Sequence, residues 1–162
     1  MVQFKKLFLL SGAAMLLGAG AGVSAQTDAQ GFIRVAPDNI VFKDAGNGVK
    51  FASIYGDPSK PGPYVIRVIF PVGVMSSPHS HSEERHVIVV KGTWFTGTDD
   101  KWDPTTAVGL PAGSYMYHPA GGVHFDGALK DEVTVQIVGV GPSKTTFLYP
   151  KEGGFGAPHK LN

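Results

Sequence analysis

Short stretches of alternating apolar and polar residues recur along most of this chain. They are rich in β-branched and aromatic residues and are bounded by glycine, proline or aspartate, which predicts strands. The segments expected to form strands are residues 49–55, 64–70, 86–90, 93–96, 114–118, 133–138 and 145–148. Helical periodicity is nearly absent. Many short strands separated by turns indicate an all-β fold that closes as a sandwich or barrel.

The first 25 residues follow a different pattern. Two lysines precede an apolar run from Leu7 to Leu17, and small residues follow up to Ala25. This order of charged, apolar and small residues is typical of a secretory signal peptide, so we expect cleavage near Ala25 and a periplasmic or secreted protein without a stable membrane anchor. A retained anchor is the alternative, but residues 18–22 are weakly apolar for a spanning helix.

The remaining chain is long enough for one domain with a real core and too short for two. Residues 57–63, rich in proline and glycine, form the clearest linker, and residues 97–111 are expected to be a solvated hairpin loop. We therefore predict a signal peptide at 1–25, N-terminal strands and linker at 26–60, a β-barrel at 61–148 and a C-terminal tail at 149–162. The glycine-rich tail is expected to cross to a partner subunit or to stay mobile.

The charge balance gives no sign of a nucleic-acid partner. Among 162 residues there are 14 basic and 13 acidic side chains, and two of the lysines lie in the N-terminal segment. No basic patch or run of like charge interrupts the chain, so nothing indicates a nucleic-acid partner. The sequence has no cysteine, no nucleophile elbow and no phosphate loop. Enzymes that depend on a cysteine nucleophile, a nucleophile elbow or a phosphate loop are therefore not indicated.

Three histidines are the candidate metal ligands. His79 and His81 stand one residue apart, and His124 follows a Pro-x-Gly turn. Side chains at i and i+2 of a strand emerge on one face, so the first two imidazoles can bind one ion if the fold brings the third to them. Imidazole is the commonest metal ligand, and the pattern predicts a divalent transition metal ion. A metal-free pair on an exposed loop is the alternative.

The segments around these histidines resemble the two sequence motifs of the cupin superfamily, the RmlC-like β-barrels. Residues 73–92 match the first motif in the opening glycine, the five-residue gap to the histidine pair and the closing glycine. Residues 113–124 match the second motif in the glycine, the Pro-x-Gly turn and the histidine. The resemblance covers roughly residues 64–148, and it implies a single-domain cupin-type jelly-roll β-barrel whose three histidines hold a divalent metal in a pocket at one end.

Two positions depart from the family pattern. Cupins usually place a glutamate four residues beyond the second histidine, where this chain has Arg85, and an asparagine where it has Ala128. Glu83 and Glu84 come just before the glutamate position. If the turn after His81 closes one residue tighter, Glu84 becomes an oxygen ligand; otherwise both glutamates are solvated on a loop. Three histidines alone also hold a first-row ion, and the sequence does not distinguish iron, manganese, nickel and zinc.

Arg85, Tyr115 and Tyr117 are the candidate catalytic residues. An Arg85 side chain that faces the pocket would pair with a substrate carboxylate or phosphate, whereas one that faces outward would form a surface ion pair. Tyr115 and Tyr117 share one face of their strand, opposite Met116 and His118. If the tyrosines line the barrel, one of them could act as an acid-base group beside a metal; the alternative is a purely structural role.

Two classes of function stay open. The resemblance implies a metal-dependent enzyme that acts on a small organic molecule, with a dioxygenase, a lyase and an isomerase all compatible. The other class is a non-catalytic module that binds or senses a small ligand or a metal. The fold does not separate them, because function depends on the site. A homodimer is expected from the resemblance and from the need to cover sheet edges.

Overall fold

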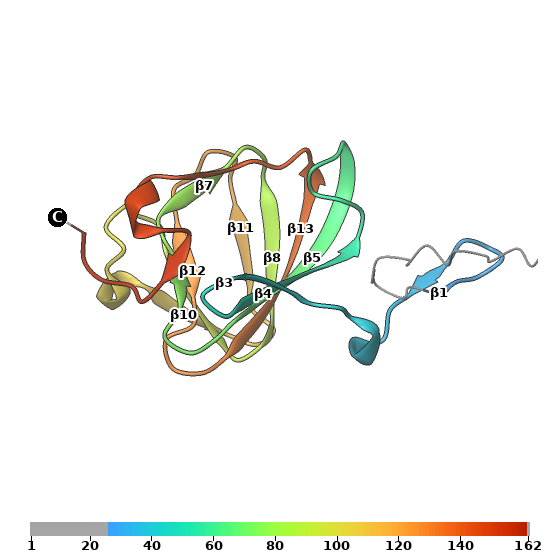
Figure 1. The fold of residues 1–162 in the computed structure, drawn as a ribbon, viewed down its shortest axis with the longest axis horizontal. Helices are drawn as coiled ribbons and strands as arrows, with labels where there is room; N and C mark the ends of the chain where they lie inside the picture. Colours follow the sequence, from blue (N-terminus) through green and yellow to red (C-terminus); the bar gives the residue numbers. More distant parts are fainter. Residues whose placement is uncertain (1–25, 162) are drawn as a thin grey trace, which may run out of the picture.

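The computed structural model describes residues 26–161, so the predicted signal peptide lies outside the described residues. Two antiparallel sheets account for most of the strands (Figure 1). Three short 3-10 helices, Pro37–Asn39, Pro104–Thr106 and Pro150–Glu152, are the only helical elements in this part of the chain. Between residues 26 and 161 no helix has the length and hydropathy needed to cross a membrane.

The larger sheet has six strands in the order β11-β8-β13-β5-β4-β3. In that order the strands span Tyr115–His118, Arg85–Lys91, Val133–Gly141, Gly62–Phe70, Val49–Tyr55 and Lys43–Gly46. The smaller sheet has five strands in the order β10-β9-β12-β6-β15, which span Val108–Pro111, Thr93–Gly97, Phe125–Gly127, Met75–Ser76 and Phe155–Gly156. The two sheets form the jelly-roll barrel that the family resemblance implies.

Two further strand pairs lie outside these sheets. β7 (His79–His81) pairs with β14 (Thr145–Phe147), and β1 (Gln26–Thr27) pairs with β2 (Ile33–Arg34). The β1-β2 hairpin lies apart from the barrel in Figure 1, whereas β7 runs along one end of it. The end of the barrel that carries β7 is therefore where the histidine pair is found.

Alternation of apolar and polar residues fixes which side chains enter the barrel. In β8 the residues Arg85, Val87 and Val89 are buried, while the residues between them are exposed. A slip of one residue would exchange the two faces, so the register is strongly specified. The turn into β9 needs Gly92, whose φ is +76° and whose added Cβ would lie 2.3 Å from the carbonyl oxygen of Glu132.

The core consists of two clusters. The larger joins the sheets through fully buried side chains of both, among them Tyr64 of β5, Val87 of β8 and Trp94 of β9. The smaller cluster packs Met75, Phe95, Trp102 and Phe125 together. Each large apolar side chain buried in this way stabilises the fold by about 1.5–3 kcal/mol.

Three sequence predictions need correction. Residues 97–111 are not merely a solvated loop, because they include β10 and the buried Trp102. The barrel extends beyond residues 61–148, since β4 pairs with β5 across the linker and belongs to the same sheet. The tail contributes β15, which pairs with β6. The edge strands β10 and β15 have only four and two residues, too few to show an alternating pattern.

Candidate metal centre

Backbone pairing brings the three predicted histidines together. His79 and His81 lie on β7 with their side chains on one face, and both are buried. The backbone of His124 pairs with that of His79, which donates to the His124 carbonyl over 2.9 Å and accepts from its N–H over 3.0 Å. The third histidine therefore reaches the pair through an antiparallel bridge, as the resemblance implies.

Hydrogen bonds at Nδ1 set the tautomers of His79 and His124. Nδ1 of His79 lies 2.8 Å from the carbonyl oxygen of Ser77, and Nδ1 of His124 lies 3.0 Å from that of Gly122. A carbonyl only accepts, so both histidines donate from Nδ1. Each then carries a lone pair on Nε2, which is the form that binds a metal.

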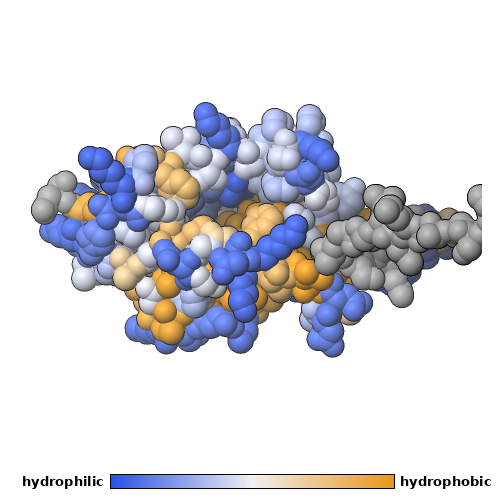
Figure 2. Space-filling model, viewed as in Figure 1, coloured by the Kyte–Doolittle hydropathy of each residue, from blue (hydrophilic) through white to orange (hydrophobic). Residues whose placement is uncertain are grey.

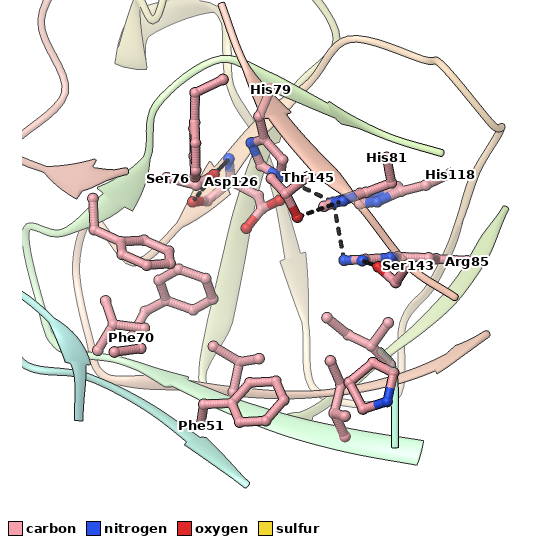
Figure 3. A pocket seen from close by; sticks show the side chains of 18 of the residues that line it. Phe51, Phe70, Ser76, His79, His81, Arg85, His118, Asp126, Ser143 and Thr145 are labelled. Carbon is pink, nitrogen blue, oxygen red and sulfur yellow. Dashed lines mark hydrogen bonds between the residues drawn. The ribbon is translucent and has the colours of Figure 1, made fainter. Parts of the chain in front are cut away.

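His81 has the same tautomer for a different reason. Its Nε2 lies 3.0 Å from Nη1 of Arg85, and a guanidinium can only donate. Nε2 of His81 is therefore the acceptor, and Nδ1 donates to the hydroxyl of Thr145 over 3.1 Å. Figure 3 shows these three residues linked at one side of the cavity.

The three Nε2 atoms fit a divalent transition metal. Those of His79 and His81 lie 3.1 Å apart and both carry lone pairs, so no hydrogen bond stabilises this approach. Two nitrogens that each ligate an ion at about 2.1 Å lie about 3.0–3.4 Å apart at octahedral or tetrahedral angles. The ligand atoms of all three histidines lie within 4.8 Å of one another, and Nε2 of His124 is buried without a hydrogen-bond partner among the described residues. This triad could hold a metal ion.

Burial keeps the imidazoles of His79 and His81 neutral. Burial, together with the neighbouring His124, lowers the pKa of His79 to about 3, and burial and the Arg85 cation lower the pKa of His81 further. A metal ion binds neutral imidazole, so protons do not compete with it near neutral pH.

Arg85 faces the cavity rather than solvent. Besides its bond to His81, its Nε donates to Oε1 of Glu83 over 2.8 Å and its Nη2 donates to the hydroxyl of Ser143 over 2.5 Å. The side chains of Arg85 and Glu83 are 9% and 12% exposed, so they form a nearly buried ion pair. The expectation that Glu83 is solvated on a loop is therefore wrong.

Glu83 is held as a carboxylate by several donors. Partial burial acts to raise its pKa, but hydrogen bonds from Ser143, Arg85, Ser82 and Tyr64 outweigh burial and lower the pKa to about 2. The hydroxyl of Tyr64 donates to Oε1 over 2.9 Å, and burial raises the pKa of this tyrosine to about 12. The network fixes the direction of the Arg85 side chain.

The structure does not bring three of the other predicted residues to the site. Glu84 is exposed and accepts a hydrogen bond from the hydroxyl of Tyr117 over 2.8 Å. Tyr115 and Tyr117 are 56% and 44% exposed on the outer face of β11. Alternation explains all three positions. Glu84 precedes the buried Arg85, and the two tyrosines pair with His86 and Ile88, which face outward.

Two residues near the triad were not identified as site residues from the sequence. Asp126 is buried with its Oδ2 3.6 Å from Nε2 of His124, and burial raises its pKa. His118 is buried with its ring centroid 3.9 Å from that of His124, and neither of its ring nitrogens has a partner among residues 26–161. These residues form a second possible ligand group with His124. The i, i+2 rule applied to His79 and His81 would have predicted Asp126 as well.

His79 and His81 of the triad line a cavity of about 420 Å³ inside the barrel. Its polar wall includes His79, His81, Arg85, His118 and Asp126. Figure 3 shows these groups on one side of the cavity, with Phe51 and Phe70 on the other. Apolar surface also extends across the middle of the barrel face drawn in Figure 2.

The sheets and the histidine cluster define a cupin, and sequence comparison defines the family. The chain matches the ChrR cupin-like domain over residues 30–144, more than half of its length. It therefore belongs to the ChrR cupin-like family. No protein of curated function matches it in sequence.

Several solved structures share the fold at low sequence identity. The polyketide cyclase RemF from Streptomyces resistomycificus is 14% identical, with a TM-score of 0.58 over 71% of this chain and 85% of its own. An RmlC-like cupin from Ralstonia eutropha is 17% identical, with a TM-score of 0.56 over 78% of this chain and 74% of its own. The DMSP lyase DddQ from Ruegeria pomeroyi is 14% identical, with a TM-score of 0.57 over 69% of this chain and 62% of its own. These similarities show the fold alone.

Proposed function

We propose that this protein is a metal-dependent cupin enzyme that acts on a small organic molecule at a mononuclear three-histidine site. One observation carries the proposal: three buried histidines share the Nδ1–H tautomer, and their ligand atoms lie within 4.8 Å of one another beside a cavity. Such a centre would bind a first-row divalent ion with positions open for substrate or water. The enzymes among the structural neighbours, a cyclase and a lyase, support a catalytic role.

The side chains at the site would have different roles. His79, His81 and His124 would hold the ion, which when bound polarises a substrate oxygen or activates water. Asp126 can hold or accept a proton inside the cavity, since its carboxyl is buried 3.6 Å from Nε2 of His124. Arg85 would orient the substrate, and the apolar wall would exclude water from the reacting groups.

A non-catalytic binding or sensing module is the second candidate. The position of Arg85 favours this candidate. Arg85 stands where other cupins have the ligand glutamate, and its guanidinium contacts Nε2 of His81, one of the proposed ligand nitrogens. A module of this kind would bind the metal or ligand and show no turnover. Turnover assays of the metal-loaded protein against small organic acids would separate the two functions.

Elemental analysis of untagged protein tests the metal centre. We expect about one equivalent of a transition metal after reconstitution, and loss of most of it in His79→Ala and His124→Ala. His86→Ala is the matched control, since His86 is exposed on the outer face of β8 and should leave the metal content unchanged. Less than about a tenth of an equivalent in the reconstituted wild type would overturn the proposal.

We also propose export with cleavage near Ala25, and a homodimer. Mass spectrometry of the protein from a periplasmic fraction would detect the shortened chain; an uncleaved cytoplasmic product would contradict export.

The proposed dimer is supported by the outer face of the larger sheet, where apolar side chains are exposed to solvent. Ile88, Val90, Tyr115 and Val140 are 39%, 43%, 56% and 63% exposed. Light scattering after size exclusion should give twice the monomer mass, and a monomer mass would exclude the dimer.

A further inference from the structure

Arg85 suggests which substrates suit the site. We propose that the cavity binds an amphipathic monocarboxylate. Its carboxylate would accept from Nη1 of Arg85 beside the ion that the three histidines would hold, and its apolar body would fill the rest of the cavity. This inference rests on the metal-dependent function proposed above. It is argued from the hydrogen bonds of Arg85, from the charge balance of the cavity and from the composition of its walls.

The hydrogen bonds of Arg85 leave one nitrogen for a ligand. Nε is used by Glu83 and Nη2 by Ser143, while Nη1 donates to Nε2 of His81. A metal that binds His81 would take this same lone pair, and Nη1 would then lose its acceptor. A buried N–H group without an acceptor is unfavourable, and more so when the group is charged, so a metal-loaded site would favour an incoming oxygen.

The charge balance favours an anion. A divalent ion and the Arg85 guanidinium together bring three positive charges to the polar wall. Glu83 supplies one negative charge through its ion pair with Arg85. The balance stays positive whether or not Asp126 is ionised, and a buried excess of one sign is stabilised by a ligand of the opposite sign.

The walls limit the anion to a small head with an apolar body. Away from the polar groups the cavity is lined by apolar side chains, which include Val49, Phe51, Ile66, Val68 and Phe70. The volume of about 420 Å³ is within the usual range for small-molecule sites. Since two of the three guanidinium nitrogens already have partners, Arg85 presents a single nitrogen. One nitrogen and one metal match the two oxygens of a carboxylate, whereas a phosphate would leave an oxygen against the apolar wall.

Calorimetry with zinc-loaded protein tests the inference. Hexanoate is the probe, and three compounds serve as comparison ligands. Hexan-1-ol has the same alkyl chain without the charge, and acetate has the carboxylate without the chain. Monohexyl phosphate has the chain with a larger anionic head. We expect hexanoate to bind at least about tenfold more tightly than each of the other three, which is the difference that one charged hydrogen bond or a buried alkyl chain produces. Metal-free protein should bind hexanoate more weakly, because Nη1 of Arg85 then keeps His81 as its acceptor.

Two variants test whether hexanoate affinity depends on Arg85. Arg85→Met keeps most of the stem and removes the charge, so hexanoate affinity should fall at least about tenfold. Arg67→Met is the matched control, since Arg67 bonds to Gln136 and does not line the cavity, and its hexanoate affinity should equal that of the wild type.

Several results would overturn the inference. Equal binding of hexanoate and hexan-1-ol by the wild type would do so even if Arg85→Met fails to fold, as would tighter binding of monohexyl phosphate. Normal zinc content without hexanoate binding would reject the monocarboxylate alone. Failure to retain zinc after reconstitution would reject the proposed function and this inference together.

Discussion

Nη1 of Arg85 donates to Nε2 of His81 over 3.0 Å. The acceptor is one of the three nitrogens that would bind the metal, so the arginine and the ion require the same lone pair. Metal binding must therefore displace this hydrogen bond and place a cation beside the guanidinium. We therefore expect Arg85, at the position of the usual cupin glutamate, to lower the metal affinity of the site.

Arg85→Glu should raise the affinity for zinc at least about tenfold. The change removes the competing donor and a positive charge, and it adds an oxygen ligand at the position where other cupins have one. Competition with a chromophoric chelator measures the affinity. Lys101→Glu makes the same charge change outside the cavity and should have little effect. An Arg85→Glu affinity equal to that of the wild type would mean that the guanidinium does not oppose the ion.

Asp126→Asn should weaken metal binding about 10–100-fold if Asp126 ligates the ion or orients His124. The carboxylate is buried beside Nε2 of His124, and the amide keeps its shape while removing its charge. The chelator competition applies here too, with Asp103→Asn as the control because Asp103 lies in an exposed turn. Unchanged metal affinity in Asp126→Asn would leave Asp126 with a role in proton transfer or structure only.

Acid should destabilise the metal-free protein in a defined pH window. Burial lowers the pKa of His79 to about 3 and that of His118 to about 2, whereas the unfolded chain takes up these protons near 6.5. The unfolded state then binds more protons, so the free energy of unfolding falls as the pH falls below about 6.5. Glu83, with a pKa of about 2 against an ordinary 4.5, adds a second loss below about 4.5.

Urea unfolding in EDTA between pH 7 and pH 5 measures the histidine part of this effect. His118→Asn removes one of the shifted groups, so it should flatten the dependence by up to about 1.4 kcal/mol per pH unit. A wild-type stability that is constant across this range would show that the histidines are protonated in the folded protein.

Tyr64→Phe should lower the free energy of unfolding by about 1.5–3 kcal/mol, which is typical for loss of a hydrogen bond to a charged group. The hydroxyl of Tyr64 is a donor to the Glu83 carboxylate, and the ring is fully buried. Tyr55→Phe is the control, because Tyr55 is 48% exposed and its change should stay within about 0.5 kcal/mol. Equal stability of the two variants would show that the Glu83 network does not depend on Tyr64.

The sequence predicted the fold because its main strands are long enough to alternate. β5, β8 and β13 each have seven or nine residues, and their buried positions follow the period of two. β6, β12 and β15 have two or three residues and acquire their conformation from their partners. Local patterns do not record such pairings, so the two strands and the tail that complete the smaller sheet were not predicted.

The residues of the candidate site likewise differ in how far the sequence predicted them. His79, His81 and His124 were predicted because each lies in a spaced motif, and the structure brings them together. The inward direction of Arg85 was left open, since it depends on the register between β8 and β13. Glu83 was misassigned because its partner Tyr64 lies on β5, far away in the sequence.

The pairing of β15 with β6 affects which shortened forms of the protein keep a closed cavity. Phe155 lines the cavity, and its strand follows every other strand of the two sheets in the sequence. All three histidines precede it. A chain truncated before residue 155 would therefore keep the three ligands and lose this wall of the cavity.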